Sequence, residues 1–253
     1  MRRAGLVALV VLSIGGCQNP FGRQYEYEEQ IYLRVDGSAS VVVDSSLPAL
    51  KTLRAITFPT AADSLGRDEI RRVIEAAGCK VTSVAKPWSR HDRRYVEFTI
   101  QIDDVRRASA CGALAWSTYT FEPATEGLHF HQSVGAPQPV DPGVVNWTGT
   151  ELVAIRLHLP SPVYFHNVRR LDNDAPGDVD RGNILTFEQT LTDRRAGKPI
   201  EADVRMGAVS ILHNTLWMFV GSFAAAVGVL AAIVWALVRK GRRQARASRR
   251  PPT

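Results

Sequence analysis

Two histidines in one short stretch are the first candidates for chemistry. His129 and His131 alternate along a predicted strand, so both imidazole rings face the same side, a spacing that can hold one metal ion. Leu128 and Phe130 then lie on the opposite side, so the histidines also fit the polar, solvated face of an ordinary strand. No HExxH motif and no Cys/His ligand spacing accompanies them. A metal site at this strand is therefore a hypothesis that rests on two ligands.

An acidic loop over residues 171–183 is a second candidate for metal binding. Gly177 stands where the sixth, sharply turning position of a calcium-binding loop would fall. Pro176 occupies the fifth position, however, and Asn183 stands where a bidentate glutamate is required. An acidic surface loop is the simpler interpretation. The candidate ligands are Asp172, Asp174, Asp178 and Asp180.

Motifs for covalent or phosphate chemistry are missing from the sequence. It contains no GxSxG nucleophile elbow and no glycine-rich phosphate loop. We therefore expect a protein that is not an enzyme and that needs no cofactor. The rival hypothesis is a metal-dependent envelope hydrolase that uses His129 and His131.

The first 16 residues have the features of a secretory signal. Two arginines precede a short apolar run, and small residues precede Cys17. The string Ser13 to Cys17 (SIGGC) resembles a bacterial lipobox, in which the cysteine is lipidated and becomes the first mature residue. We therefore expect a signal peptide over residues 1–16, a lipid on Cys17 and a short tether over residues 17–24.

The remaining cysteines form an even pair. With Cys17 assigned to a lipid, Cys79 and Cys111 lie in an oxidising compartment, where a disulfide between them is expected. The bond would close a loop of about 33 residues and contribute about 3–4 kcal/mol in the chain-entropy model. The alternative is two buried thiols that act as small apolar side chains.

A long apolar segment near the C-terminus determines the organisation of the chain. Residues 216–238 contain no charge and no proline, and a helix of this length crosses a bilayer core of about 30 Å. The tail, residues 239–253, has seven basic residues and no acidic one, so it should stay cytoplasmic. The protein is then a single-pass protein of the inner (cell) membrane, with its large domain extracytoplasmic and a juxtamembrane connection at 208–215.

The charge balance changes once these anchors are removed. The net charge of +6 comes from the tail and the N-terminal arginines, and the remainder has 22 basic against 25 acidic residues. No basic face is left for nucleic acid, so we expect none as a partner. The membrane is the expected partner, together with a lipid or an envelope protein.

Between the anchors the sequence predicts an α+β outer part over residues 25–134. Gln30 to Asp44 alternates as a hairpin around an Asp36-Gly37 turn, and Arg94 to Asp103 is the strongest strand. Residues 47–56 and Arg67 to Ala77 read as helices. Ser117 to Glu122 and Leu128 to Val134 form a further strand pair.

A Pro/Gly-rich loop over residues 135–143 is a candidate boundary before a β-rich part at 144–207. In that part Asn183 to Leu191 is expected to pair with Ile200 to Met206 as a hairpin. The fold class is therefore α+β: an antiparallel-strand-rich extracytoplasmic domain with two or three short helices, plus one C-terminal transmembrane helix. The two parts are expected to share a core.

This layout is similar to that of LppM-like bacterial envelope lipoproteins. The stretches that carry the resemblance are Ile14 to Cys17, Tyr32 to Val43, Leu157 to Asn167, Gly182 to Leu191 and the terminal span. The resemblance implies a non-catalytic envelope role with lipid or glycolipid contact, and it supplies no catalytic residue. A further alternative is a protein-contact scaffold or sensor that dimerises through small-xxx-small pairs in its span, such as Gly221 and Ala225.

Overall fold

A computed structural model describes residues 23–137 and 140–247, and its fold is mixed α+β, as the sequence predicts. The predicted signal peptide, Cys17 and the end of the tail lie outside the described residues. Within them, the strands form one seven-stranded and one four-stranded sheet.

The larger sheet has the order β10-β8-β1-β2-β5-β3, with β4 also paired to β5. Among these pairs only β1 and β8 run parallel. The strands are β1 (Tyr25–Leu33), β2 (Ala39–Ser46), β3 (Val81–Val84), β4 (Trp88–Arg90), β5 (Arg93–Ile102), β8 (Leu152–His158) and β10 (Ile184–Thr190). The smaller sheet has the order β6-β7-β11-β9. Its strands are β6 (Ser117–Ala124), β7 (Gly127–Val134), β9 (Val163–His166) and β11 (Ile200–Met206).

The hairpin expected around Asp36-Gly37 is confirmed. Strands β1 and β2 pair antiparallel from Tyr27 opposite Ser45 to Leu33 opposite Ala39. Gly37 has φ +83°, and a Cβ there would lie 3.1 Å from the Phe121 ring. Glycine is the residue that accepts both the left-handed backbone and the close ring.

Two short α-helices form where the sequence predicts them. Helix α1 (Leu47–Arg54) begins after Ser46, whose side chain accepts a hydrogen bond from the Ala49 N–H, and it tolerates Pro48 in its first turn. Helix α2 (Arg67–Ala76) buries Ile70 and Ile74. The 3₁₀ turns are η1 (Ala62–Ser64), η2 (Val105–Ala110) and η3 (Gly112–Leu114).

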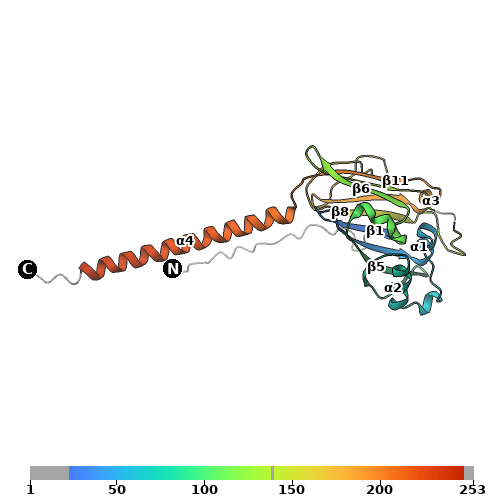
Figure 1. Cartoon of the computed structure of the whole chain (residues 1–253), viewed down its shortest axis with the longest axis horizontal. Helices are drawn as coiled ribbons and strands as arrows, with labels where there is room; N and C mark the ends of the chain where they lie inside the picture. The colour runs from blue at the N-terminus through green and yellow to red at the C-terminus, as the bar shows by residue number, and fades with distance from the viewer. Residues whose placement is uncertain (1–22, 138–139, 248–253) are drawn as a thin grey trace, which may run out of the picture.

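One face of the seven-stranded sheet carries the core. Its apolar side chains, from Ile31 on β1 to Phe98 on β5, belong to one buried cluster that also takes in Phe130 and Val204 of the smaller sheet. The smaller sheet covers one half of this face, and α1 and α2 lie beside β5 at the other half (Figure 1). The opposite face is polar and partly exposed.

The prediction that residues 183–191 and 200–206 pair as a hairpin is wrong. Strand β10 pairs with β8, whereas β11 pairs with β7 and β9 in the other sheet. The connecting residues form helix α3 (Leu191–Arg195), capped by Thr190, whose hydroxyl accepts from the Asp193 N–H. A helical turn here redirects the chain from one sheet to the other. The stretches 25–134 and 144–207 therefore each supply strands to both sheets.

Helix α4 (Ile211–Ala247) projects from the globular part as one long rod (Figure 1). Its segment Thr215–Lys240 has a mean hydropathy of 2.2, and none of it is buried within the described structure. Phe219 and Phe223 are 70% and 73% exposed. By length and composition this segment is able to cross a membrane.

Candidate functional site

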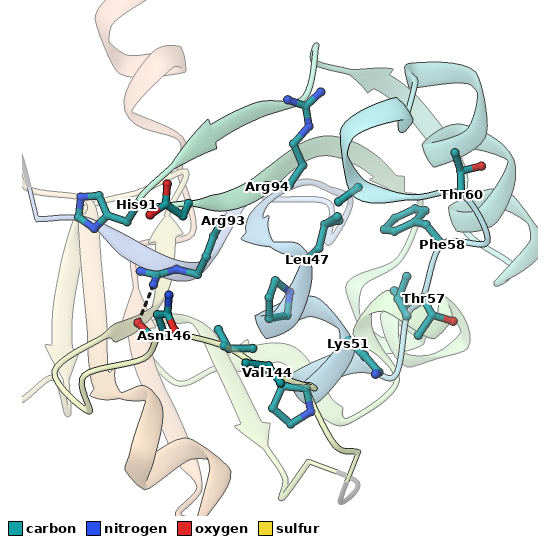
Figure 2. Close-up of a pocket in the computed structure, with 16 residues that line it drawn as sticks. Leu47, Lys51, Thr57, Phe58, Thr60, His91, Arg93, Arg94, Val144 and Asn146 are labelled. Carbon is teal, nitrogen blue, oxygen red and sulfur yellow. Dashed lines mark hydrogen bonds between the residues drawn. The ribbon is translucent and has the colours of Figure 1, made fainter.

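The candidate site is a cleft of about 500 Å³, called here the distal cleft. Four segments line it: the start of α1, residues 56–62, the β4–β5 turn, and the loop at 142–146 (Figure 2). Arg93 of the cleft binds Glu26 at the start of β1, whereas α4 is rooted at the far end of the neighbouring strand β8, through a bond from the Ile211 N–H to the Pro160 oxygen. At about 3.3 Å per residue, Glu26 and Leu33 are about 23 Å apart along β1. The cleft therefore lies at the end of the large sheet that is far from α4.

Apolar side chains form much of the cleft wall. Leu47, Ile56 and Phe58 come from α1 and the segment after it, and Val144 comes from the opposite loop (Figure 2). Val144 is fully exposed. A wall of this kind offers favourable burial to an apolar group of a ligand.

Cationic side chains line the same cleft. Lys51 lies on α1, and Arg93 and Arg94 begin β5. Arg93 donates to Glu26 Oε1 from Nε at 3.0 Å and Nη2 at 2.7 Å, and to the Asn146 carbonyl oxygen at 3.1 Å (Figure 2). Burial acts to lower the pKa of Arg93, but the charge and hydrogen bonds of Glu26 together with Tyr95 outweigh it and the pKa is raised. Nε of Arg94 is buried without a hydrogen-bond partner.

The β4–β5 turn at this cleft has an unusual backbone. His91 and Asp92 both have positive φ, +49° and +58°, in a two-residue connection between paired strands. Such hairpin turns favour Asn-Gly because non-glycine residues are strained in the left-handed region. Strained residues concentrate where a surface is used, so this turn marks the cleft as a candidate site.

Together these features describe a binding surface. Apolar contacts next to guanidinium and ammonium groups suit a ligand that has an apolar body and an anionic group. Arg93 is fixed by Glu26, whereas Lys51 and Arg94 line the cleft from two elements. Arg94 Nη1 donates to the Ser89 hydroxyl oxygen at 3.4 Å.

A buried charged cluster lies between the two sheets and α1. Glu29 of β1 is 0% exposed, and Arg54 of α1 donates to its Oε2 at 2.9 Å. Tyr27 donates to the same oxygen at 2.9 Å, and Gln132 of β7 donates to Oε1 at 3.1 Å. Burial raises the pKa of Tyr27. This cluster joins elements that are distant in the sequence, so its role is structural.

A row of carboxylates lies on the other face of the large sheet. Glu28, Asp44 and Glu97 are directly opposite one another on β1, β2 and β5. Burial, then the charges of Glu28 and Glu97, raise the pKa of Asp44 to about 7. Burial also raises the pKa of Glu28, against the charge of Arg156, 2.9 Å away.

The structure places His129 and His131 on one face of β7 but gives them separate partners. His129 Nε2 lies 2.8 Å from Asp203, and His131 Nε2 lies 3.2 Å from Glu201. Across the described ranges, no three His, Cys, Asp or Glu side chains are grouped as a metal site would require. The metal hypothesis is therefore not carried further.

The aspartates of the acidic loop also do not form a common site. Asp178 pairs with Arg170, Asp174 has a left-handed backbone at φ +54°, and the Asp180 N–H donates to the Ile184 oxygen. Asp172 is the fourth candidate ligand that the sequence suggested. In the described part of the chain, these four carboxylates are not grouped as a metal ion would require.

Cys79 and Cys111 form a disulfide, as expected, with an S–S distance of 2.05 Å. The bond joins the residues after α2 to the segment between η2 and η3. It holds the segment that contains η2 and η3 against the end of α2.

Sequence reasoning missed the distal cleft. Its walls come from residues near 50, 60, 92 and 144, and no periodic pattern links such distant stretches. The available signal was the run SRHDRR at 89–94, a basic stretch with a two-residue interruption between strand patterns.

Fold and site together define an α+β domain with a ligand-sized cleft and one long apolar C-terminal helix. The sequence matches no protein-family model and no curated protein. A weak structural likeness exists to the folded domain of the Mycobacterium tuberculosis LppM protein, solved by NMR. It covers 76% of this chain and 96% of that one, with 9% identity and a TM-score of 0.40.

Proposed function

We propose that this chain is a membrane-anchored bacterial envelope lipoprotein whose extracytoplasmic domain is a non-catalytic binding or scaffold module. The observation that carries the proposal is α4. An apolar segment of 26 residues that the folded domain does not bury needs a nonpolar environment from elsewhere. A lipid on Cys17 would add a second, weaker anchor.

In this proposal the distal cleft is the binding site. Its ligand is a lipid or glycolipid that presents an apolar portion to Phe58 and Val144 and an anionic group to Lys51 and Arg94. The mixture of apolar and cationic side chains in one cleft supports this class of ligand. The domain would then hold its site away from the inner membrane, where a ligand or an envelope protein can reach it.

A titration tests the binding site. The full-length chain in phosphatidylcholine nanodiscs is titrated with soluble short-chain phosphatidylglycerol by calorimetry, with empty nanodiscs as the blank. Lys51→Glu and Arg94→Glu are each expected to weaken binding about tenfold, a loss of about 1.4 kcal/mol. Lys86→Glu, an exposed lysine outside the cleft, is the matched control and should bind as the wild type does. Absence of saturable binding, or equal losses in all three variants, would contradict the cleft as the site.

A further inference from the structure

Two neighbouring aromatic side chains are exposed on β9. Tyr164 is 64% and Phe165 is 45% exposed. Successive strand residues point to opposite faces, so a well-covered strand would bury one of the two. Strand β9 is the edge of the four-stranded sheet, and neither of its faces is covered at this point.

This aromatic pair lies at the root of α4. The Gly207 N–H donates to the Pro162 oxygen at 3.0 Å, and the Ile211 N–H donates to the Pro160 oxygen at 2.9 Å. A Cβ on Gly207 would lie 2.9 Å from the Tyr164 hydroxyl oxygen. The chain from β11 into α4 is thus bound to the loop that leads into β9, and the aromatic pair is held beside it.

The short connection from Ile211 to Thr215 determines how far the aromatic pair lies from the hydrocarbon core of a bilayer. The apolar segment begins at Thr215, four helical residues after Ile211, or about 6 Å along the axis. The headgroup layer on each side of a bilayer core is about 5–7 Å thick. If α4 spans the membrane, Ile211 is at the outer limit of the headgroups, and the residues bound to its loop face that layer.

The chemistry of the surrounding side chains fits a headgroup layer. Arg205 is exposed, and its guanidinium carbon lies 5.4 Å from the Phe165 ring centroid. Val209 and Leu212 of the connection are exposed as well. Aromatic rings at this depth favour the membrane interface, and arginine binds lipid phosphate while its stem covers apolar surface. Tyr164, Phe165 and Arg205 line one pocket together with two carboxylates, Glu122 and Glu126. Glu122 lies 3.6 Å from His129 Nδ1.

We infer that Tyr164, Phe165 and Arg205, with Val209 and Leu212, form a membrane-contact surface. It rests on the headgroup layer of the bilayer that α4 spans and limits the tilt of the domain about the α4 root. The inference depends on the proposed membrane anchor, because without a bilayer at α4 this surface has no layer to meet. It does not depend on the ligand of the distal cleft.

Site-specific photocrosslinking in native membranes tests the membrane-contact surface. The photoreactive residue p-benzoylphenylalanine replaces Tyr164, Phe165, Lys86 or Phe223, one at a time, in the full-length chain. Phe223 lies in the middle of the apolar segment and reports insertion of α4. Lys86 is exposed, lies outside the distal cleft beside the Ala85–Glu97 backbone bond at the far edge of the large sheet, and is the control. Lipid adducts are identified by mass spectrometry after irradiation.

The expected result is lipid adducts from positions 164, 165 and 223 and no lipid adduct from position 86. Adducts at 223 with none at 164 and 165 would overturn the membrane-contact surface and leave the anchor intact. Adducts from 164 and 165 to a second protein chain would overturn it in favour of a protein interface. No adduct at 223 would instead contradict the anchor itself, and the inference would fall with it.

Discussion

Charge is buried where the two sheets meet α1. Arg54 and Glu29 are almost fully enclosed, and Tyr27 and Gln132 complete the hydrogen bonds of the carboxylate. A buried pair of this kind adds little net stability compared with apolar residues of the same size, but the loss of one partner leaves a charge without compensation. The cluster therefore fixes the relative position of β1, β7 and α1.

The first prediction concerns this ion pair. Arg54→Met should lower the free energy of unfolding by about 3–5 kcal/mol, because the Glu29 carboxylate stays buried without its cation. Urea unfolding of the full-length chain in mild detergent, followed by near-ultraviolet circular dichroism, measures the change. The double variant Arg54→Met/Glu29→Leu should recover part of the loss. If the double variant loses as much stability as the two single variants together, Arg54 and Glu29 are not coupled.

The second prediction concerns Asp44 and pH. Its pKa rises from 3.8 to about 7 on folding, through burial and the charges of Glu28 and Glu97. The folded state therefore binds the proton more tightly, so this contribution to stability is full below pH 3.8 and is lost as the pH rises through about 7. Asp44→Asn should raise the free energy of unfolding at pH 8 by on the order of 2 kcal/mol after solvent screening. The free energy of unfolding should also change less steeply with pH in the variant than in the wild type. Unfolding curves from pH 4 to pH 8 with the same slope for wild type and variant would contradict this assignment.

At the scale of elements, the β4–β5 turn stores backbone strain. His91 and Asp92 both occupy the left-handed region, at a cost of about 1–2 kcal/mol for each residue. The turn places Arg93 and Arg94 at the cleft, so its strain is located beside the binding residues.

The third prediction follows from this strain. Replacing the pair by Asn-Gly (His91→Asn, Asp92→Gly) should raise the free energy of unfolding by about 1–2 kcal/mol. Gly37→Ala is the opposite control and should destabilise the chain, because φ is +83° there and the Phe121 ring is close. Thermal unfolding of the three proteins in one detergent measures both effects. A destabilised Asn-Gly variant would mean that His91 or Asp92 makes contacts that outweigh the strain.

The fourth prediction concerns the disulfide. The double variant Cys79→Ser/Cys111→Ser should lower the free energy of unfolding by about 3 kcal/mol, since the bond closes a loop with a separation of 32 residues. Guanidinium unfolding with and without reductant measures the loss. Reductant should destabilise the wild type and leave the double variant unchanged. A wild type that is indifferent to reductant would contradict a stabilising bond.

Most local elements were predictable from the sequence, because they depend on near neighbours. The β1–β2 hairpin follows from alternation and Gly37, and α1 follows from Ser46 and Pro48. The parallel pairing of β1 with β8 and the separation of β10 from β11 were not predictable. Parallel partners are more than 100 residues apart here, and α3 looked like a turn because a five-residue helix carries too short a periodic pattern.

At the scale of the whole molecule, the candidate site depends on this long-range topology. The cleft lies at one end of β1, and α4 is rooted at the other end of the same sheet. The sequence identified the long apolar helix because an apolar run is a local property. It did not identify the cleft because four distant segments build it. For His129 and His131 the sequence predicted a shared strand face correctly but did not show their partners. They lie on one face, but each ring meets a carboxylate on a neighbouring strand.

The molecule is thus arranged along one axis, with α4 at one end and α1 at the other (Figure 1). The start of α1 lines the distal cleft. This arrangement determines on which side of a membrane each end of the molecule would lie. If the apolar segment crosses the membrane with its basic tail inside, then the cleft loop and the tail lie in different compartments.

Cysteine labelling in spheroplasts measures this consequence most directly. Single substitutions Val144→Cys, in the cleft loop, and Ser248→Cys, in the tail, are made in the full-length chain, where Cys79 and Cys111 are already bonded. The account predicts that a membrane-impermeant maleimide labels Val144→Cys in intact spheroplasts and labels Ser248→Cys only after lysis. Labelling of Ser248→Cys in intact spheroplasts, or protection of Val144→Cys, would contradict an outward-facing domain anchored by α4.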